Sequence, residues 1–392
     1  MPKEVVIVSA VRTPIGSFMG SLSKIPAPKL GAIAIKGAIK KIDLDTNLID
    51  EVLMGHVVQS GAGQAPARQA AIFAGIPDTV PCTTVNKVCA SGMKTVIQAA
   101  QSISIGDRDI VVAGGMENMS LIPHYIGSRN PKKFGSIIMD DGMQKDGLTD
   151  SFNQKAMGVL ADLCAKKFSL TREKQDNYAI ESYKRSLNAS KKGLFEKEII
   201  KVEIPQKNGE VIYVSKDEEL NNIKLEKIPK LKATFTSDGT VTAANASTIN
   251  DGAAALILMS REKAESLNLK PIASILSYED TALDPDWFTI APSEAIPKAL
   301  KKINMSINDI DYFELNEAFS AVALANMKIL NLDSSKVNVN GGAVSIGHPL
   351  GCSGARIIVT LLNVLEQNNG KIGVAAICNG GGGASAMIVK LV

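Results

Sequence analysis

Short apolar runs occur at four places along the chain and predict buried strands. They occupy residues 5–8, 110–113, 256–259 and 374–377, and none of them contains a charged residue. Near-continuous apolar runs of this length are typical of central strands that helices cover on both faces. After Cys89 the apolar residues recur at helical spacing and predict a helix through Met93, Val96, Ile97, Ala100 and Ile103.

Parts of this pattern occur twice. Residues 49–56, 5–8 and 111–115 resemble residues 310–317, 272–275 and 374–378, at separations of 261, 267 and 263 residues. Cys89-Ala-Ser-Gly92 and Cys352-Ser-Gly354 also each open an apolar helical stretch. The alternative interpretation is that strand–glycine–helix units are common to all α/β proteins. A duplication predicts two similar α/β halves, each a sheet flanked by helices.

The middle of the chain interrupts the repeat. Residues 129–133, 166–174 and 216–232 are densely charged, and residues 173–192 have the period of a helix. This stretch predicts a long insertion into the first half. We therefore expect three parts: a first half made of residues 1–119 and 248–270, an insertion at 120–247, and a second half at 271–392.

Composition excludes several classes of protein. The 392 residues are 45% hydrophobic and 21% charged, which is enough apolar material for a large core. Lys+Arg 43 nearly balances Asp+Glu 40 without long blocks of one sign, which argues against nucleic acid or a membrane surface as the main partner. Five cysteines without a CxxC pair argue against a disulfide framework, and three scattered histidines argue against a zinc site.

The ends of the sequence suggest no targeting. Residues 1–14 run directly into an apolar stretch without a signal or transit pattern, and the last residues carry no peroxisomal or retention signal. The longest apolar runs, such as 253–259, are much shorter than the roughly 20 residues that span a bilayer. We therefore expect a soluble cytoplasmic protein.

Cys89 is the first candidate for chemistry. It lies where the predicted helix begins, and backbone N–H groups and the helix dipole stabilise a thiolate at such a position. Most free cysteines are buried and inert, which is the alternative. His348 is the second candidate, because it stands between Gly347 and Pro349 in the glycine-rich segment 340–354. Such a loop can hold an imidazole that deprotonates a thiol, although a purely structural histidine is possible here too.

Two further motifs lie at the ends of predicted strands. Cys378 precedes four glycines, so a thiol meets a backbone that is free to expose N–H groups, as an oxyanion hole requires. A flexible turn after a buried cysteine is the alternative. Asn316-Glu317 could order a water molecule or could simply cap a helix. The chain has neither a Walker loop nor a Gly-x-Gly-x-x-Gly after its first strand, which disfavours ATP and NAD binding by those routes.

Together these motifs resemble the thiolase family over essentially the whole chain. The matching segments are Val11–Gly16, Gly63–Arg68, Val88–Gly92, Ala113–Ser120, Asp238–Asp251, Asn316–Phe319, Gly347–Pro349 and Cys378–Gly383. The resemblance implies the duplicated, five-layered α-β-α-β-α fold of that family, which is what the repeat would produce.

The resemblance also implies roles. Cys89 would accept the acyl group, His348 would activate it, and Cys378 would exchange the α-proton of the second acetyl-CoA. Asn316 would hold a water that forms one oxyanion hole with His348, and the N–H groups of Cys89 and Gly380 would form the other. The chemistry needs no metal or redox cofactor, because CoA is both substrate and carrier.

Within the family, the chain is most similar to the short-chain group that acts on acetoacetyl-CoA. The implied reaction is the reversible condensation of two acetyl-CoA to acetoacetyl-CoA and CoA. A 3-ketoacyl-CoA thiolase of broader chain length is the alternative. Met157 and Phe288 would line the acyl pocket, unless they are ordinary core residues. Further substrate and CoA contacts are implied for Ser247, Lys227, Tyr183, Ala318 and Phe319, whereas residues 220–224 depart from the family's arginine-containing pattern.

Some short-chain relatives bind potassium near CoA. The corresponding positions here are Tyr183, Ala243, Ala244, Ala246 and Val344. The resemblance further implies a homo-oligomer, a dimer of dimers. Three other classes compete with this interpretation. A decarboxylating ketoacyl synthase would need two histidines beside its cysteine, a catalytically inactive acyl-CoA-binding module would lack one of the three reactive residues, and a redox protein would need paired thiols.

Overall fold

Ten strands form the main sheet of the computed structural model, which describes residues 2–129 and 131–392. Their order is β12-β13-β14-β11-β1-β10-β5-β3-β4, with β2 paired to β10. The strands are β1 (Val5–Arg12), β2 (Gly16–Ser17), β3 (Glu51–Gly55), β4 (Cys82–Val85), β5 (Ile110–Asn118), β10 (Asn250–Ser260), β11 (Ala273–Ala282), β12 (Tyr312–Leu315), β13 (Ile372–Asn379) and β14 (Gly383–Leu391).

The strand order reads almost the same from both ends, because β3-β5-β10-β1 of the first half mirrors β12-β13-β14-β11 of the second. The two halves meet where β1 pairs with β11, through Val6 opposite Ser274 and Ile7 opposite Ala273. The four strands predicted from apolar runs are all present, and each extends beyond its run. The duplication inferred from the sequence is therefore visible as a repeated sheet topology.

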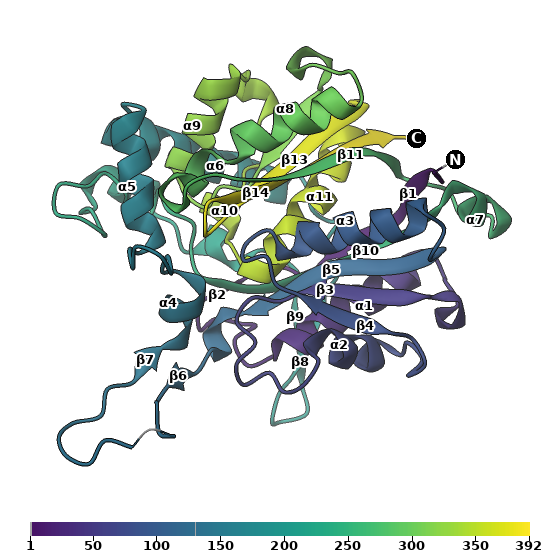
Figure 1. Ribbon diagram of the computed structural model, residues 1–392, viewed down its shortest axis with the longest axis horizontal. Coiled ribbons are helices and arrows are strands. Elements are labelled where there is room, and N and C mark those ends of the chain that lie inside the picture. Colours follow the sequence, from purple (N-terminus) through teal and green to yellow (C-terminus); the bar gives the residue numbers. More distant parts are fainter. Residues whose placement is uncertain (1, 130) are drawn as a thin grey trace.

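Helices complete five layers (Figure 1). α1 and α2 cover the outer face of the first half, α3 and α11 pack against each other between the two halves, and α8 covers the outer face of the second. The helices of the two halves are α1 (Ala27–Lys41), α2 (Pro66–Ala74), α3 (Ser91–Ser104), α7 (Arg261–Ser266), α8 (Pro292–Lys302), α9 (Ser320–Leu330), α10 (Ala343–Ile346) and α11 (Leu350–Gln367).

The central layer explains why α3 forms where it does. All five residues that predicted this helix are fully buried in the core between the two halves, beside α11. α11 is hydrophobic on nearly every side because both halves of the sheet cover it; its buried residues run from Leu350 to Leu365. Helices α3 and α11 are therefore held by apolar burial from both sides, which fixes the positions of their first turns.

The segment between β5 and β10 carries its own elements. They are α4 (Gly142–Gly147), α5 (Met157–Lys167), α6 (Arg172–Lys191) and the strand pairs β6 (His124–Tyr125) with β7 (Asp140–Asp141) and β8 (Val202–Pro205) with β9 (Val211–Val214). The helix predicted at 173–192 is α6, capped by the Thr171 hydroxyl. Short 3₁₀ helices occur at Thr46–Leu48, Met119–Leu121, Glu218–Asn221, Leu225–Lys230, Pro285–Ile290, Ile307–Asp309 and Ser334–Lys336.

A buried ion pair fastens this segment to the first half. The fully buried Arg12 guanidinium on β1 donates to Glu198 at 2.6 Å and to Asp217 at 2.7 and 2.9 Å. Because a buried guanidinium is costly without partners, the loss of both carboxylates would strand a charge in the core. The β6–β7 arm, in contrast, projects away from the body of the molecule (Figure 1). None of the helices in the described part of the chain combines the length and apolar character of a membrane span.

Candidate active site

The reactive residues of the two halves precede the two central helices. Cys89 lies two residues before α3, and His348 lies two residues before α11. In both loops the residue immediately before has a positive φ, +47° at Val88 and +106° at Gly347. Since α3 and α11 pack against each other, their first turns bring Cys89 and His348 to the same cavity.

The turn before α3 is strained and fixed by hydrogen bonds. Val88 is β-branched in the left-handed region, a conformation that costs about 1–3 kcal/mol and persists only where the surroundings impose it. Here Ser91 imposes it, because its hydroxyl accepts from the Lys87 N–H at 2.8 Å and donates to the Val88 carbonyl at 2.6 Å. Cys89 is thereby held at the tip of a rigid turn.

The loop before α11 is held by two buried polar side chains that the sequence reasoning missed as site residues. The Asn250 amide oxygen accepts from the His348 N–H at 3.0 Å, and the Glu117 carboxylate accepts from the Gly351 N–H at 2.8 Å. A Cβ on Gly347 would lie 2.3 Å from the Asn250 side chain, so only glycine fits. The available signal was polar residues at the ends of otherwise apolar strands, since Asn250 begins β10 and Glu117 lies near the end of β5.

His348 is buried and has two polar neighbours. Its Nδ1 lies 2.6 Å from the Ser353 hydroxyl, and its Nε2 lies 3.4 Å from the Asn316 amide nitrogen. Burial, together with the positive charge of Arg356, lowers the pKa of His348 to about 3. The imidazole is therefore neutral at physiological pH and can accept a proton. The Asn316 amide oxygen is buried and has no hydrogen-bond partner among the described residues, so it can accept from a water molecule or a ligand.

Cys89 corrects one expectation from the sequence. A cysteine at a helix start was expected to be stabilised as a thiolate, but burial raises the pKa of Cys89 to about 12. Hydrogen bonds from the backbone N–H groups of Gly380 and Cys89 itself act in the opposite direction without compensating for the lost hydration. Cys89 is thus a neutral thiol at rest, with two N–H groups directed at its sulfur.

Cys378 lies near the end of β13 with its side chain 1% exposed. It packs in a cluster with Met157, Phe288, Ala318 and Phe319. Burial raises the pKa of Cys378 well above its usual value, and the negative charge of an ionised Cys89 raises it further. The two thiols are therefore close enough to influence each other's ionisation.

A cavity of about 660 Å³ opens onto these groups. Several of the sequence-predicted residues line it: Cys89, Met157, Ala243, Ala246, Ser247, Phe288, Ala318, Phe319 and His348. Residues that were not predicted contribute most of the remaining wall, among them Phe18, Leu148, Phe235, Ile249 and Leu350. The cavity wall is mainly apolar, and polar residues such as Gln144, Asn222 and Thr248 also contribute to it.

Other predicted residues lie outside the cavity wall. Cys378, Asn316 and Gly380 stand behind it in contact with residues that line it. Lys227 is exposed on the 3₁₀ helix Leu225–Lys230 and does not line the cavity. Tyr183 is buried in a separate cluster with Ala244 and Val344. The structure thus collects the predicted catalytic residues in and behind one cavity wall, which most of the predicted substrate positions share, whereas Lys227, Tyr183, Ala244 and Val344 lie outside it.

Family models define the class of protein. "Thiolase, N-terminal domain" matches residues 5–262, and "Thiolase, C-terminal domain" matches residues 269–391. The chain belongs to the thiolase family and is an acyltransferase.

Individual relatives show which members of the thiolase family the chain is similar to. The chain is 54% identical to "Acetyl-CoA acetyltransferase ERG10, cytosolic" of Gibberella zeae, over 98% of each chain. It is 53% identical to the mitochondrial acetyl-CoA acetyltransferase of Bos taurus, over 99% of this chain and 91% of the relative. The crystal structure of Acat5 thiolase from Ascaris suum in complex with coenzyme A matches with a TM-score of 0.95 and 46% identity over 100% of both chains.

Proposed function

We propose that this protein catalyses the reversible condensation of two acetyl-CoA to acetoacetyl-CoA and CoA. The observation that carries the proposal is that Cys89 and His348 line one mainly apolar cavity while Cys378 packs directly behind its wall, close to Cys89. Full-length relatives named as acetyl-CoA acetyltransferases support the choice of substrate.

In the first half-reaction, Cys89 takes the acetyl group. His348 Nε2 accepts the thiol proton while the sulfur attacks the thioester carbonyl. The N–H groups of Cys89 and Gly380 stabilise the oxyanion of the tetrahedral intermediate. The carbon–sulfur bond to CoA then breaks, and the leaving thiolate takes the proton from His348. Because thiol and imidazole are both neutral at rest, the proton moves only as the new bond forms.

In the second half-reaction, Cys378 in its ionised form takes the α-proton of the second acetyl-CoA. The Asn316-bound water donates to the enolate oxygen beside His348, and a well-placed donor of this kind contributes about 3–4 kcal/mol. The enolate carbon attacks the acetyl group, and the bond to Cys89 Sγ breaks. A proton transfer from Cys378 to Cys89 restores the starting state. Because burial raises the pKa of Cys378, the ionised form is a minor species at rest but a strong base, as removal of a proton from a weak carbon acid requires.

The acyl end of the cavity favours short chains. Met157 and Phe288 both face it, and a Cβ on Gly380 would lie 3.5 Å from the Met157 sulfur. A broad-range 3-ketoacyl-CoA thiolase, the second candidate, would need this end to open. We assign Ser247, Ala318 and Phe319 to the CoA channel, with Lys227 as an outer contact and Tyr183 as a buried residue that supports the channel from behind.

Potassium is a further part of the proposal. Tyr183, Ala244 and Val344 share one buried cluster, and Ala243 and Ala246 lie on the turn that joins this cluster to the cavity. Carbonyl and hydroxyl oxygens are the ligands such an ion takes, so these residues fit it. Potassium would order the 243–246 turn, and we expect KCl to raise the melting temperature more than NaCl at equal ionic strength.

We also propose a dimer of dimers in the cytoplasm and the three-part division of the chain at 119/120, 247/248 and 270/271. The β6–β7 arm supports self-association, because it exposes Phe134, Ile137, Ile138 and Met139 by 92%, 64%, 82% and 62%. Apolar side chains gathered on one projecting segment are typical of an interface. Light scattering that shows a stable monomer at micromolar concentration would contradict this part.

The test of the proposed function has two readouts. Labelled acetyl-CoA should leave one acetyl group on the peptide that contains Cys89, and not on those with Cys352 or Cys378. Turnover of acetoacetyl-CoA should exceed that of a long-chain 3-ketoacyl-CoA by orders of magnitude. Comparable rates for both substrates would favour the broad-range enzyme, and an adduct on another cysteine would overturn the assignment of the nucleophile.

A further inference from the structure

Ser353 lies against the face of His348 that is turned away from Asn316. It is fully buried in the first turns of α11, and no step of the proposed reaction uses it. Its hydroxyl is 2.6 Å from His348 Nδ1 and 2.9 Å from the carbonyl oxygen of Pro349. A hydroxyl has one proton to donate, so it cannot donate to both neighbours at once.

The neighbour that receives the Ser353 proton determines which tautomer His348 adopts. If Ser353 donates to the Pro349 carbonyl, a common arrangement of a helical serine and the carbonyl four residues earlier, its oxygen is left as an acceptor. The imidazole then donates through Nδ1–H, and Nε2 is left without a proton. On the opposite side of the ring, Nε2 faces the Asn316 amide nitrogen, which can only donate. Both neighbours therefore favour the same tautomer.

We propose that Ser353 is a positioning residue that holds His348 as the Nδ1–H tautomer, so that Nε2 is the proton acceptor for Cys89. The proposal rests on the proposed role of His348. When Nε2 takes the Cys89 proton, the imidazole becomes positively charged, and the Ser353 oxygen is the group that stabilises Nδ1–H during that step. When CoA leaves with the Nε2 proton, the original tautomer returns.

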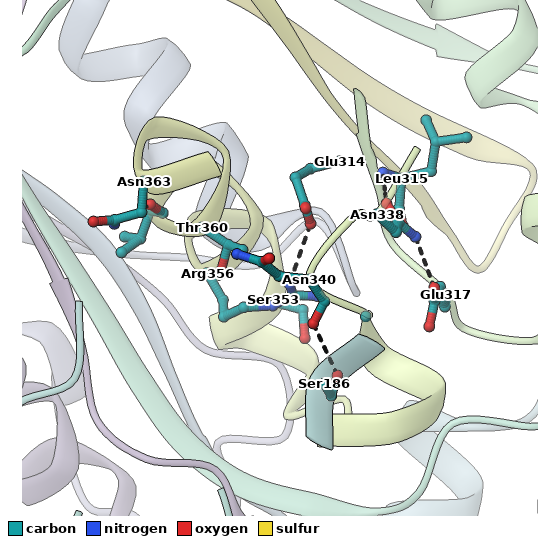
Figure 2. A network of polar contacts seen from close by, with 12 residues as sticks. Ser186, Glu314, Leu315, Glu317, Asn338, Asn340, Ser353, Arg356, Thr360 and Asn363 are labelled. Carbon is teal, nitrogen blue, oxygen red and sulfur yellow. Dashed lines mark hydrogen bonds and ion pairs between the residues drawn. The ribbon is translucent and has the colours of Figure 1, made fainter. Parts of the chain in front are cut away.

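The surroundings of Ser353 increase its importance. Arg356 lies one turn further along α11, and Figure 2 shows its side chain beside Ser353, with Glu314 facing the guanidinium at 3.5 Å. The Arg356 charge opposes a positive imidazole, as the lowered pKa of His348 reflects. Burial raises the pKa of Glu314 to about 8, so this carboxyl balances Arg356 only in part near neutral pH. The neighbouring charges do not stabilise a positive imidazole. The Ser353 oxygen, a neutral acceptor at Nδ1, supplies this stabilisation.

The tautomer can be observed directly, because the chain contains only three histidines. In protein labelled with ¹⁵N-histidine, the His348 signals are those lost in His348→Gln. We expect Nδ1 at the shift of a protonated nitrogen and Nε2 at that of a bare one. In Ser353→Ala the two tautomers should mix or reverse. A wild-type enzyme whose His348 carries its proton on Nε2 would overturn the proposal.

Kinetics give the second readout. Ser353→Ala should slow formation of the acetyl enzyme about 10–100-fold, as loss of the hydrogen-bond partner that orients a functional histidine typically does, with KM for acetyl-CoA unchanged. Ser353→Thr, which keeps the oxygen, should restore most of the rate. Ser277→Ala is the matched control, because it removes a buried hydroxyl bonded to a backbone carbonyl far from the cavity, and it should leave the rate unchanged.

The His348→Ala variant distinguishes a failure of the Ser353 proposal from a failure of the proposed role of His348 as the base. If His348→Ala is acetylated as fast as the wild type, the role of His348 as the base falls. If His348→Ala is inactive but Ser353→Ala is acetylated at the wild-type rate, only the positioning role of Ser353 falls.

Discussion

The starts of α3 and α11 are built alike and carry different chemistry. In each half the helix follows a residue with positive φ and then a reactive side chain two residues before its first turn. The strand ends beside them also correspond, because His56 directly follows β3 and Asn316 directly follows β12. The duplicated backbone accounts for the proximity of the two loops, and the residues placed on them account for the reaction.

The loops differ in how their conformation is maintained. Val88 is strained and is fixed from within its own turn by Ser91, whereas Gly347 is relaxed at its φ and is fixed from the other half by Asn250. The two halves also differ in their strands, because Cys378 lies on a strand of the second half only. In the proposed reaction, the first half would thus supply the nucleophile, while the second half would supply both groups that move protons.

The sharpest test of this division is Cys378→Ser. If the second half supplies the base for carbon acidity, the variant should still be acetylated on Cys89, because that step uses His348 and the N–H donors. It should lose condensation and α-proton exchange by about 10²–10⁴-fold, because a serine hydroxyl is a much weaker base. Mass spectrometry of the acetylated peptide and deuterium exchange into acetyl-CoA measure the two steps. Equal loss of both would mean that the thiols act as one unit.

The difference between the two loops predicts unequal tolerance at the residues with positive φ. Gly347→Ala should destabilise the protein by about 2 kcal/mol or more, because the new Cβ combines backbone strain with a collision against Asn250. Val88→Ala keeps the same backbone requirement with less bulk and should cost less. Urea unfolding of both variants measures the contrast. A Gly347→Ala variant as stable as the wild type would show that the second loop has room to shift.

The two reactive groups should limit stability on opposite sides of neutral pH. The pKa of His348 falls from its ordinary 6.5 to about 3 in the folded chain. Between about pH 6.5 and 3, the unfolded chain therefore binds a proton at His348 that the folded chain does not bind. The free energy of unfolding falls as the pH drops through this range, by about 1.4 kcal/mol per pH unit from this group. The pKa of Cys89 rises from 9.0 to about 12, so its contribution is lost as the pH rises through that window.

Replacing either residue should reduce the pH dependence of the free energy of unfolding on one side of neutral pH only. His348→Gln should reduce the slope of unfolding free energy on the acid side, and Cys89→Ala should reduce it on the alkaline side. Urea unfolding at several pH values for the three proteins measures these slopes. A His348→Gln variant with the wild-type acid slope would show that the imidazole becomes protonated without unfolding.

The sequence predicted the repeated halves well because burial on both faces leaves a strong apolar signal, as in β1, β5 and α3. Cys89, His348, Cys378 and Asn316 were recognisable because their motifs interrupt that signal with small and polar residues at element ends. The partners of the loops were harder to find. Asn250, Glu117 and Ser353 act across long separations in sequence or through a single hydroxyl, so spacing alone does not link them to His348. The ionisation of Cys89 was mistaken for the same reason, since the depth of its burial depends on the other half.

The smallest effect tests whether the halves still correspond away from the site. Ser9 and Ser277 each follow an irregularity in β1 and β11, and each hydroxyl donates at 2.8 Å to a carbonyl of the outer helix, at Ala38 of α1 and Ala299 of α8. A buried hydrogen bond of this kind contributes about 1 kcal/mol. Ser9→Ala and Ser277→Ala should therefore cost similar amounts in urea unfolding. The two costs should add in the double variant, because the sites share no partner. Activity should not change. If one substitution cost several times as much as the other, the outer layers would have diverged as far as the catalytic loops have.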